Sequence, residues 1–171
     1  SMPLGSVVNP RPRSVGAAAR HIAGNLCCPA GFGALARAVP ERAQAESLAD
    51  SAVRIVGVNA SGKLFHSRCG GASGMGGSHN GDGPCIQCPS TKRNMPVEMA
   101  EFTAPAFLVE RKRIRADSGG PGRYRGGCGV ELDVKIIGEA SGVCYPSVMG
   151  TVHPAHGLQD GQPGAVARFT L

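Results

Sequence analysis

Residues 115–129, RADSGGPGRYRGGCG, decide the fold more than any other stretch of this 171-residue chain. They hold six glycines, one proline and three arginines around a single Asp117-Ser118 pair. This composition disfavours a helix and is too rich in glycine for the interior of an ordinary strand. It predicts a tight loop in which the backbone approaches another backbone or a ligand closely, because glycine carries no Cβ atom.

Strands are predicted on both sides of this loop. Residues 107–115 lead into it, and their cationic run ERKRIR is interpreted as the solvated face of a strand. Residues 129–137 leave the loop and alternate apolar with charged side chains, which is typical of a half-buried strand. The apolar positions, which we expect to be buried, are Val130, Leu132, Val134 and Ile136. Residues 143–148 and 165–171 are further strand candidates.

Helices are predicted nearer the N-terminus. Residues 15–23 are rich in alanine and predict a helix with Ser14 as its N-cap, ending at Gly24-Asn25. A second helix is predicted within residues 31–48, broken or bent near Pro40 because proline lacks a backbone N–H.

A hairpin follows the predicted helices. Residues 52–58 and 63–67 have strand patterns separated by the turn 59–62. Residues 70–83 contain seven glycines and predict irregular structure. Further along the chain, Glu98 and Glu101 would share one face of a short helix of one or two turns. The predicted fold class is therefore α+β, with short helices near the N-terminus and a β-rich C-terminal half joined by glycine-rich loops.

Composition narrows the class of protein. Apolar residues make up 42% of the chain, as in globular proteins, and no apolar run approaches the ~20 residues that span a bilayer. Seven cysteines, an odd number, without a secretory signal pattern suggest free thiols and a cytoplasmic location. The net charge is +6, but aromatics are only 4%, so we expect neither nucleic-acid nor membrane binding.

Several motifs together carry a resemblance to a known family. Glycine-loop residues 115–129 lie between an N-x-P-V-E motif at 94–98 and PAHGLQDGQPG at 154–164, and GSVVNP at 5–10 and GGASG at 70–74 precede them. In this order they resemble the C-terminal part of the hydantoinase B/oxoprolinase family. Residues 1–4 are interpreted as an extended start that includes a cloning scar, and residues 5–171 as a single domain.

The resemblance implies a function. Family members work with an A-type partner that handles ATP, and they open cyclic amides such as oxoproline and hydantoins or, in a related branch, carboxylate ketones. We therefore expect a subunit or fragment of an ATP-dependent cyclic-amide hydrolase, inactive alone, with a ketone carboxylase subunit as the alternative. No cofactor is expected on this chain. ATP and a divalent metal belong to the A-type partner or to a missing N-terminal B-type portion, and we expect an oligomer.

The glycine loop supplies the candidate binding residues. Guanidinium groups together with glycine amides suit a carboxylate or a phosphate. The alternative is structural: Asp117 pairs with Arg123 or Arg125 and locks a turn whose glycines take positive φ. The candidates for substrate binding or loop structure are Arg115, Ser118, Gly119, Gly120, Arg123, Arg125, Gly126 and Gly127.

Catalytic candidates are few. Glu98 could act as a general base, or a carboxylate here could bind backbone amides; Asp117 is the second candidate. Cys128 would be a reactive thiol if the neighbouring arginines lowered its pKa.

A metal site is a further alternative. His66, Cys69, Cys85 and Cys88 have a spacing typical of zinc ribbons and would make the chain a non-catalytic interaction module.

Overall fold

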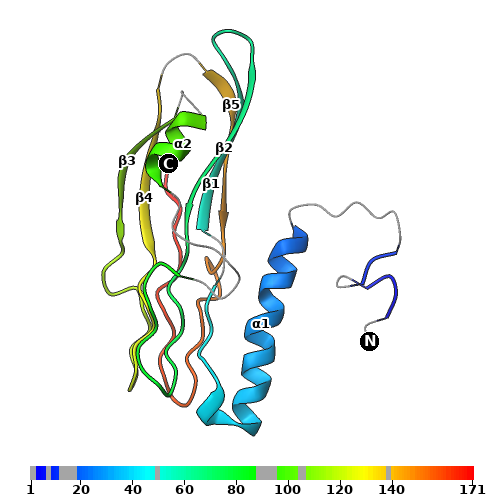
Figure 1. Cartoon of the computed structure of the whole chain (residues 1–171), viewed down its shortest axis with the longest axis vertical. Helices are drawn as coiled ribbons and strands as arrows, with labels where there is room; N and C mark the ends of the chain where they lie inside the picture. The colour runs from blue at the N-terminus through cyan, green and yellow to red at the C-terminus, as the bar shows by residue number, and fades with distance from the viewer. Residues whose placement is uncertain are drawn as a thin grey trace.

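The computed structural model of the chain describes residues 3–6, 9–11, 19–48, 51–87, 96–103, 107–137 and 140–171. Two antiparallel sheets lie against each other, and long loops extend from one end of them (Figure 1). The prediction of an α+β fold is confirmed. The elements are α1 (Ala19–Ala38), η1 (Pro40–Arg42), β1 (Ser51–Asn59), β2 (Leu64–Gly71), α2 (Val97–Thr103), β3 (Phe107–Ile114), β4 (Val130–Ile136) and β5 (Ala140–Val148).

Helix α1 replaces the two helices that the sequence predicts. It runs without interruption through Gly24-Asn25, so the predicted helix end there is wrong. A glycine ends a helix by adopting a left-handed φ, and Gly24 does not. The prediction at Pro40 is confirmed, because α1 ends at Ala38 and the chain continues as the 3-10 turn η1. Ser14 and residues 15–18 lie outside the described residues.

The first sheet has the strand order β2-β1-β5, and its β1–β2 hairpin is the predicted one. Asn59 organises the turn, since its Oδ1 accepts the backbone N–H of Ser61 at 3.1 Å and of Lys63 at 2.9 Å. Gly62 supplies the left-handed residue at φ 75°. Strand β2 extends to Gly71 and so carries the sheet into the glycine-rich segment.

The core lies between the first sheet and the β3–β4 pair. Val53 and Ile55 of β1 lie opposite Cys69 and Ser67 of β2, so these side chains share one face. Helix α2 packs on β2 and β3 and closes one side. The buried apolar residues of this cluster are Val53, Ile55, Cys69, Ala100 and Phe107.

Strand β4 meets most of its prediction. Leu132 and Val134 are half-buried and pack against the core, and Val130 lies against Gly71. Ile136, expected to be buried, is 46% exposed. It pairs with Phe107 at the last position of the β3–β4 ladder, where fewer neighbours can cover it.

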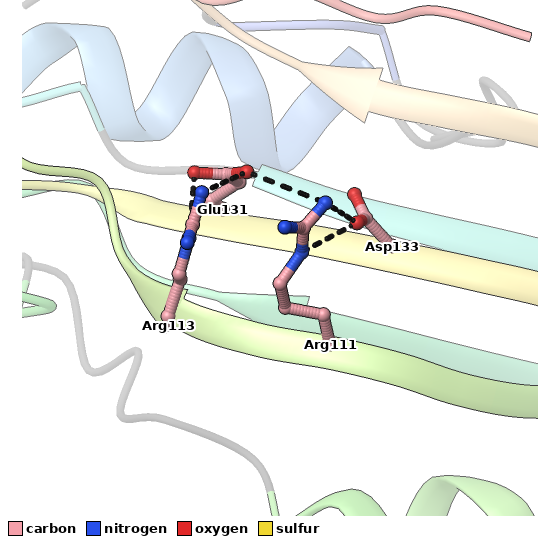
Figure 2. A network of polar contacts seen from close by, with 4 residues as sticks. All are labelled: Arg111, Arg113, Glu131 and Asp133. Carbon is pink, nitrogen blue, oxygen red and sulfur yellow. Dashed lines mark hydrogen bonds and ion pairs between the residues drawn. The ribbon is translucent and has the colours of Figure 1, made fainter.

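The outer face of β3–β4 carries charged pairs, as predicted for a solvated face (Figure 2). The Arg113 guanidinium donates to Glu131 at 3.0 and 3.1 Å, and Arg111 Nε donates to Asp133 at 2.7 Å. Arg111 and Arg113 of the ERKRIR run are thus paired with carboxylates from the neighbouring strand.

The C-terminal segment is not a strand. Ala165 N donates to Ser118 O at 3.0 Å and Ala167 N donates to Gly150 O at 2.9 Å. These bonds go to two different segments, so no ladder with a single partner forms, and the strand predicted over 165–171 is wrong.

Among the described residues, no helix combines the length and apolar character that crossing a bilayer requires.

Candidate functional site

Three glycine-rich segments run side by side at the end of the sheets opposite the β1–β2 turn (Figure 1). We call residues 70–87, 115–129 and 149–165 the glycine layer. Backbone hydrogen bonds join them: Gly127 N donates to Met75 O at 2.8 Å, and Gln162 N donates to Pro121 O at 2.9 Å. The layer is therefore assembled through main-chain groups rather than through a side-chain core.

Glycine is required at several positions of this layer because there is no room for a Cβ atom. A Cβ on Gly74 would collide with the carbonyl of Gly127, and one on Gly127 with the carbonyl of Pro84. A Cβ on Gly119 would meet Gly126 O, and one on Gly120 would meet Gln162 O. The predicted close approach of backbones is confirmed.

The predicted positive φ of the loop glycines is wrong. None of the six glycines in residues 115–129 adopts a left-handed φ, whereas Asp117 does, at 53°. Gly119, Gly120 and Gly127 are needed because neighbouring backbone leaves no space for a Cβ atom, which the conformational preferences of turns do not predict.

The loop arginines have structural partners. Arg125 pairs with Asp117 at 3.2 Å, which confirms the predicted ion pair, and its backbone N–H donates to Asp82 Oδ1 at 2.7 Å. Arg115 donates to Val166 O at 2.8 Å. The Arg123 guanidinium lies over the Tyr124 ring, 5.5 Å from its centroid. Asp82 was missed as a site residue, although the Asp-Gly pair at 82–83 lies among the seven glycines of 70–83.

Ser118 joins several parts of the layer. Its hydroxyl donates to Arg115 O at 2.7 Å and accepts from Gly129 N at 2.9 Å. Its carbonyl accepts from Ala165 N at 3.0 Å. Ser118 thus ties both ends of the loop to the C-terminal segment, a structural role that the sequence left open.

Two thiols meet in the layer. The Cys128 N–H donates to Cys85 Sγ at 3.1 Å. Burial acts to raise the pKa of the Cys128 thiol, but hydrogen bonds from the Gly119 and Ser118 amides, the Ser118 side chain and Cys85 lower it below its ordinary value. The sequence pointed to the arginines as the cause of such a shift; the structure assigns it to these hydrogen bonds.

The zinc-ribbon alternative does not fit strand β2. His66 and Cys69 are three residues apart on an extended strand, so their side chains point to opposite faces. His66 is exposed, and Cys69 is fully buried in the core, where burial raises the pKa of its thiol. Cys85 lies in the glycine layer, and Cys88 lies outside the described residues.

The carboxylates of α2 have different surroundings. Glu101 Oε1 accepts the backbone N–H of Val109 at 2.8 Å, so it holds α2 to β3. Glu98 is exposed. The carboxylate that binds a backbone amide is thus Glu101, and the role of Glu98 stays a prediction. Nearby, Lys112 Nζ donates to Gly70 O at 3.2 Å, and burial lowers the pKa of this amine.

A cleft of about 1010 Å³ lies between the glycine layer, strands β1, β4 and β5, and the C-terminal segment. Its walls include the loop candidates Arg115, Ser118, Gly119, Gly120, Arg123, Gly126 and Gly127, but Arg125 is not among them. Within the described part of the chain, no three His, Cys, Asp or Glu residues gather as a metal site. The walls of the cleft also carry apolar side chains such as Leu132 and Met149 and the carboxylates of Glu46, Glu131 and Asp133.

Comparison with known proteins identifies the family. A sequence model of the hydantoinase B/oxoprolinase family matches residues 1–171. The chain belongs to this family. A nucleotide-free structure of acetone carboxylase has the same fold, with a TM-score of 0.67 and 22% identity, over 97% of this chain and 23% of that one. An uncharacterized protein of Methanocaldococcus jannaschii is 29% identical over 108 residues, which are 63% of this chain and 19% of its own length. The chain thus spans about a fifth of the length of the proteins it matches.

Proposed function

We propose that this member of the hydantoinase B/oxoprolinase family supplies substrate-side structure to an ATP-dependent cyclic-amide hydrolase. The family match over the whole chain carries the proposal. An A-type subunit binds ATP and phosphorylates the amide oxygen of the substrate, and a divalent metal is held by that subunit or by a further B-type portion. This chain is inactive alone.

The glycine layer suits such a role. Cleaving a ring C–N bond after phosphorylation of the amide oxygen develops negative charge, which fixed hydrogen-bond donors stabilise best. The walls of the cleft hold backbone groups in place through main-chain bonds such as Gly126 N to Gly120 O at 3.0 Å. A backbone held in this way keeps its groups in place before a substrate arrives, with little reorganisation during the reaction.

Arg123 is the residue we propose for contact with an anionic group of the substrate. It lies on the cleft wall. Arg115 also lies on the cleft wall, but its guanidinium donates to Val166 O, and Arg125 pairs with Asp117. Its contact with Tyr124 leaves the charged guanidinium exposed. A guanidinium fork can bind the carboxylate of oxoproline in a bidentate manner.

Reconstitution tests the proposal. The full-length B-type protein with and without its A-type subunit would be supplied with oxoproline or hydantoin and ATP, and ring-opened product and ADP measured together. We expect product only when both subunits are present, and no ATP binding by this chain alone in calorimetry. ATP-dependent carboxylation of acetone without ring opening would instead support the ketone carboxylase alternative, which the acetone carboxylase fold suggests.

A matched pair of variants tests Arg123. In the assembled enzyme, Arg123→Ala should raise KM for an anionic substrate by about tenfold or more, since a charge-assisted bond to a substrate contributes roughly 1.5–3 kcal/mol. Arg37→Ala, in α1, should leave KM unchanged. Equal KM values for the two variants would remove Arg123 from the substrate site.

A further inference from the structure

Cys85 and Cys128 are brought together by two neighbouring segments of the glycine layer. Besides the 3.1 Å bond from Cys128 N to Cys85 Sγ, Ile86 N donates to Cys128 O at 2.9 Å. These two bonds hold the backbone of residues 85–86 next to that of Cys128. The sulfur of Cys85 thus lies 3.1 Å from the backbone nitrogen of Cys128, although the residues are 43 positions apart in the chain.

The turn beside them forms a nest for a thiolate. Asp117 has a left-handed φ of 53°, and the two backbone amides that follow it, of Ser118 and Gly119, lower the pKa of the Cys128 thiol. Consecutive amides that converge in this way bind anions. Cys128 is partly exposed and Cys85 is exposed, so small reagents can reach the pair.

We infer that Cys85 and Cys128 form a redox-active dithiol that hydroperoxides oxidise to a disulfide. Thiolate character together with exposure selects which cysteines react with peroxides. Cys128, in the amide nest, is the attacking thiol, and Cys85 is the resolving thiol. The product is a covalent link between the first two segments of the glycine layer.

The chemistry proceeds in two steps. The Cys128 thiolate attacks one oxygen of hydrogen peroxide; an S–O bond forms, the O–O bond breaks, and hydroxide leaves and takes up a proton to become water. The Cys85 thiolate then attacks the sulfenic sulfur; an S–S bond forms, the S–O bond breaks, and hydroxide leaves and takes up a proton to become a second water. Two thiols lose two electrons and one peroxide gains them.

The test treats the full chain with equimolar hydrogen peroxide, blocks the remaining thiols and maps the peptides by mass spectrometry. We expect a Cys85–Cys128 cross-linked peptide that disappears on reduction. In the untreated protein at neutral pH, Cys128 should be alkylated about tenfold faster than Cys144, whose pKa burial raises. These two measurements need no substitution and therefore do not depend on a variant folding.

Variants assign the two roles. Cys85→Ser should leave a sulfenic acid on Cys128 that dimedone traps, Cys128→Ser should abolish the cross-link, and the control Cys144→Ser should preserve it. Circular dichroism checks that each variant folds. Alkylation of Cys128 no faster than that of Cys144, or a disulfide that maps to Cys85–Cys88 instead, would overturn the inference.

Discussion

The β3–β4 sheet and the glycine layer are neighbours held together in opposite ways. Side chains hold the sheet: Phe107 and Leu132 pack inward, and Arg113 pairs outward with Glu131 (Figure 2). Main-chain groups hold the layer, where segments lie too close together for a Cβ atom at positions such as Gly127. In the sheet the cost of a substitution depends on the atoms that it removes. In the layer it depends on the atoms that it adds.

The largest expected effect comes from removing side-chain atoms in the sheet region. Phe107 is 2% exposed, and Phe107→Ala should lower the free energy of unfolding by about 3–5 kcal/mol, through lost burial and the cavity left behind. Phe102, at the end of α2, is 88% exposed, so Phe102→Ala should change stability by less than about 0.5 kcal/mol. Urea unfolding measures both. If both variants lost a similar amount of unfolding free energy, Phe107 would not be part of the buried core.

A smaller effect of opposite origin is expected from adding one methyl group to the layer. Gly127→Ala places a Cβ against the backbone of Pro84, which cannot move aside as a flexible side chain would, and should destabilise by about 1–3 kcal/mol. Gly31→Ala is the matched control, because Gly31 lies within α1 and nothing stands within 4 Å of its added Cβ. That variant should stabilise the helix by up to about 1 kcal/mol. Thermal melts that move in the same direction for both variants would contradict this view of the layer.

The same comparison explains how much of the fold could be predicted from sequence. The β1–β2 hairpin and strand β4 were found because period-2 patterns and turn residues are local signals. Ala165 and Ala167 bond to two different segments, so residues 165–171 have a strand pattern without a strand partner. Helix α1 passes through Gly24 because a glycine stops a helix only when its backbone turns left-handed.

The candidate site was predictable in kind but not in detail. The composition of residues 115–129 correctly indicated close backbone approach and the Asp117–Arg125 pair. It could not indicate which segments approach, since Gly74 and Gly120 face carbonyls that lie far away in sequence. Spacing suggested that Cys85 belonged with His66 and Cys69, whereas tertiary structure pairs it with Cys128. Long-range backbone contacts leave no periodic trace in the chain.

The smallest expected effect is electrostatic and tests the outer face of the sheet. The hydrogen bond from Arg113, with the charges of Arg113 and Arg111, lowers the pKa of Glu131 below its ordinary value. Because the folded pKa lies below the unfolded one, the carboxylate stabilises the fold above about pH 4.3, and this contribution is lost as the pH falls through the folded pKa. Glu131→Gln removes this stabilising contribution of the carboxylate. The wild-type protein should therefore have a slightly higher free energy of unfolding than the variant at pH 7, and the two values should become equal in acid. Arg113 is exposed and Glu131 is partly exposed, so added salt should also shrink the difference. Urea unfolding of both proteins from pH 7 to pH 3 measures it, and a difference that widens as the pH falls would mean that Glu131 is stabilised in its protonated form instead.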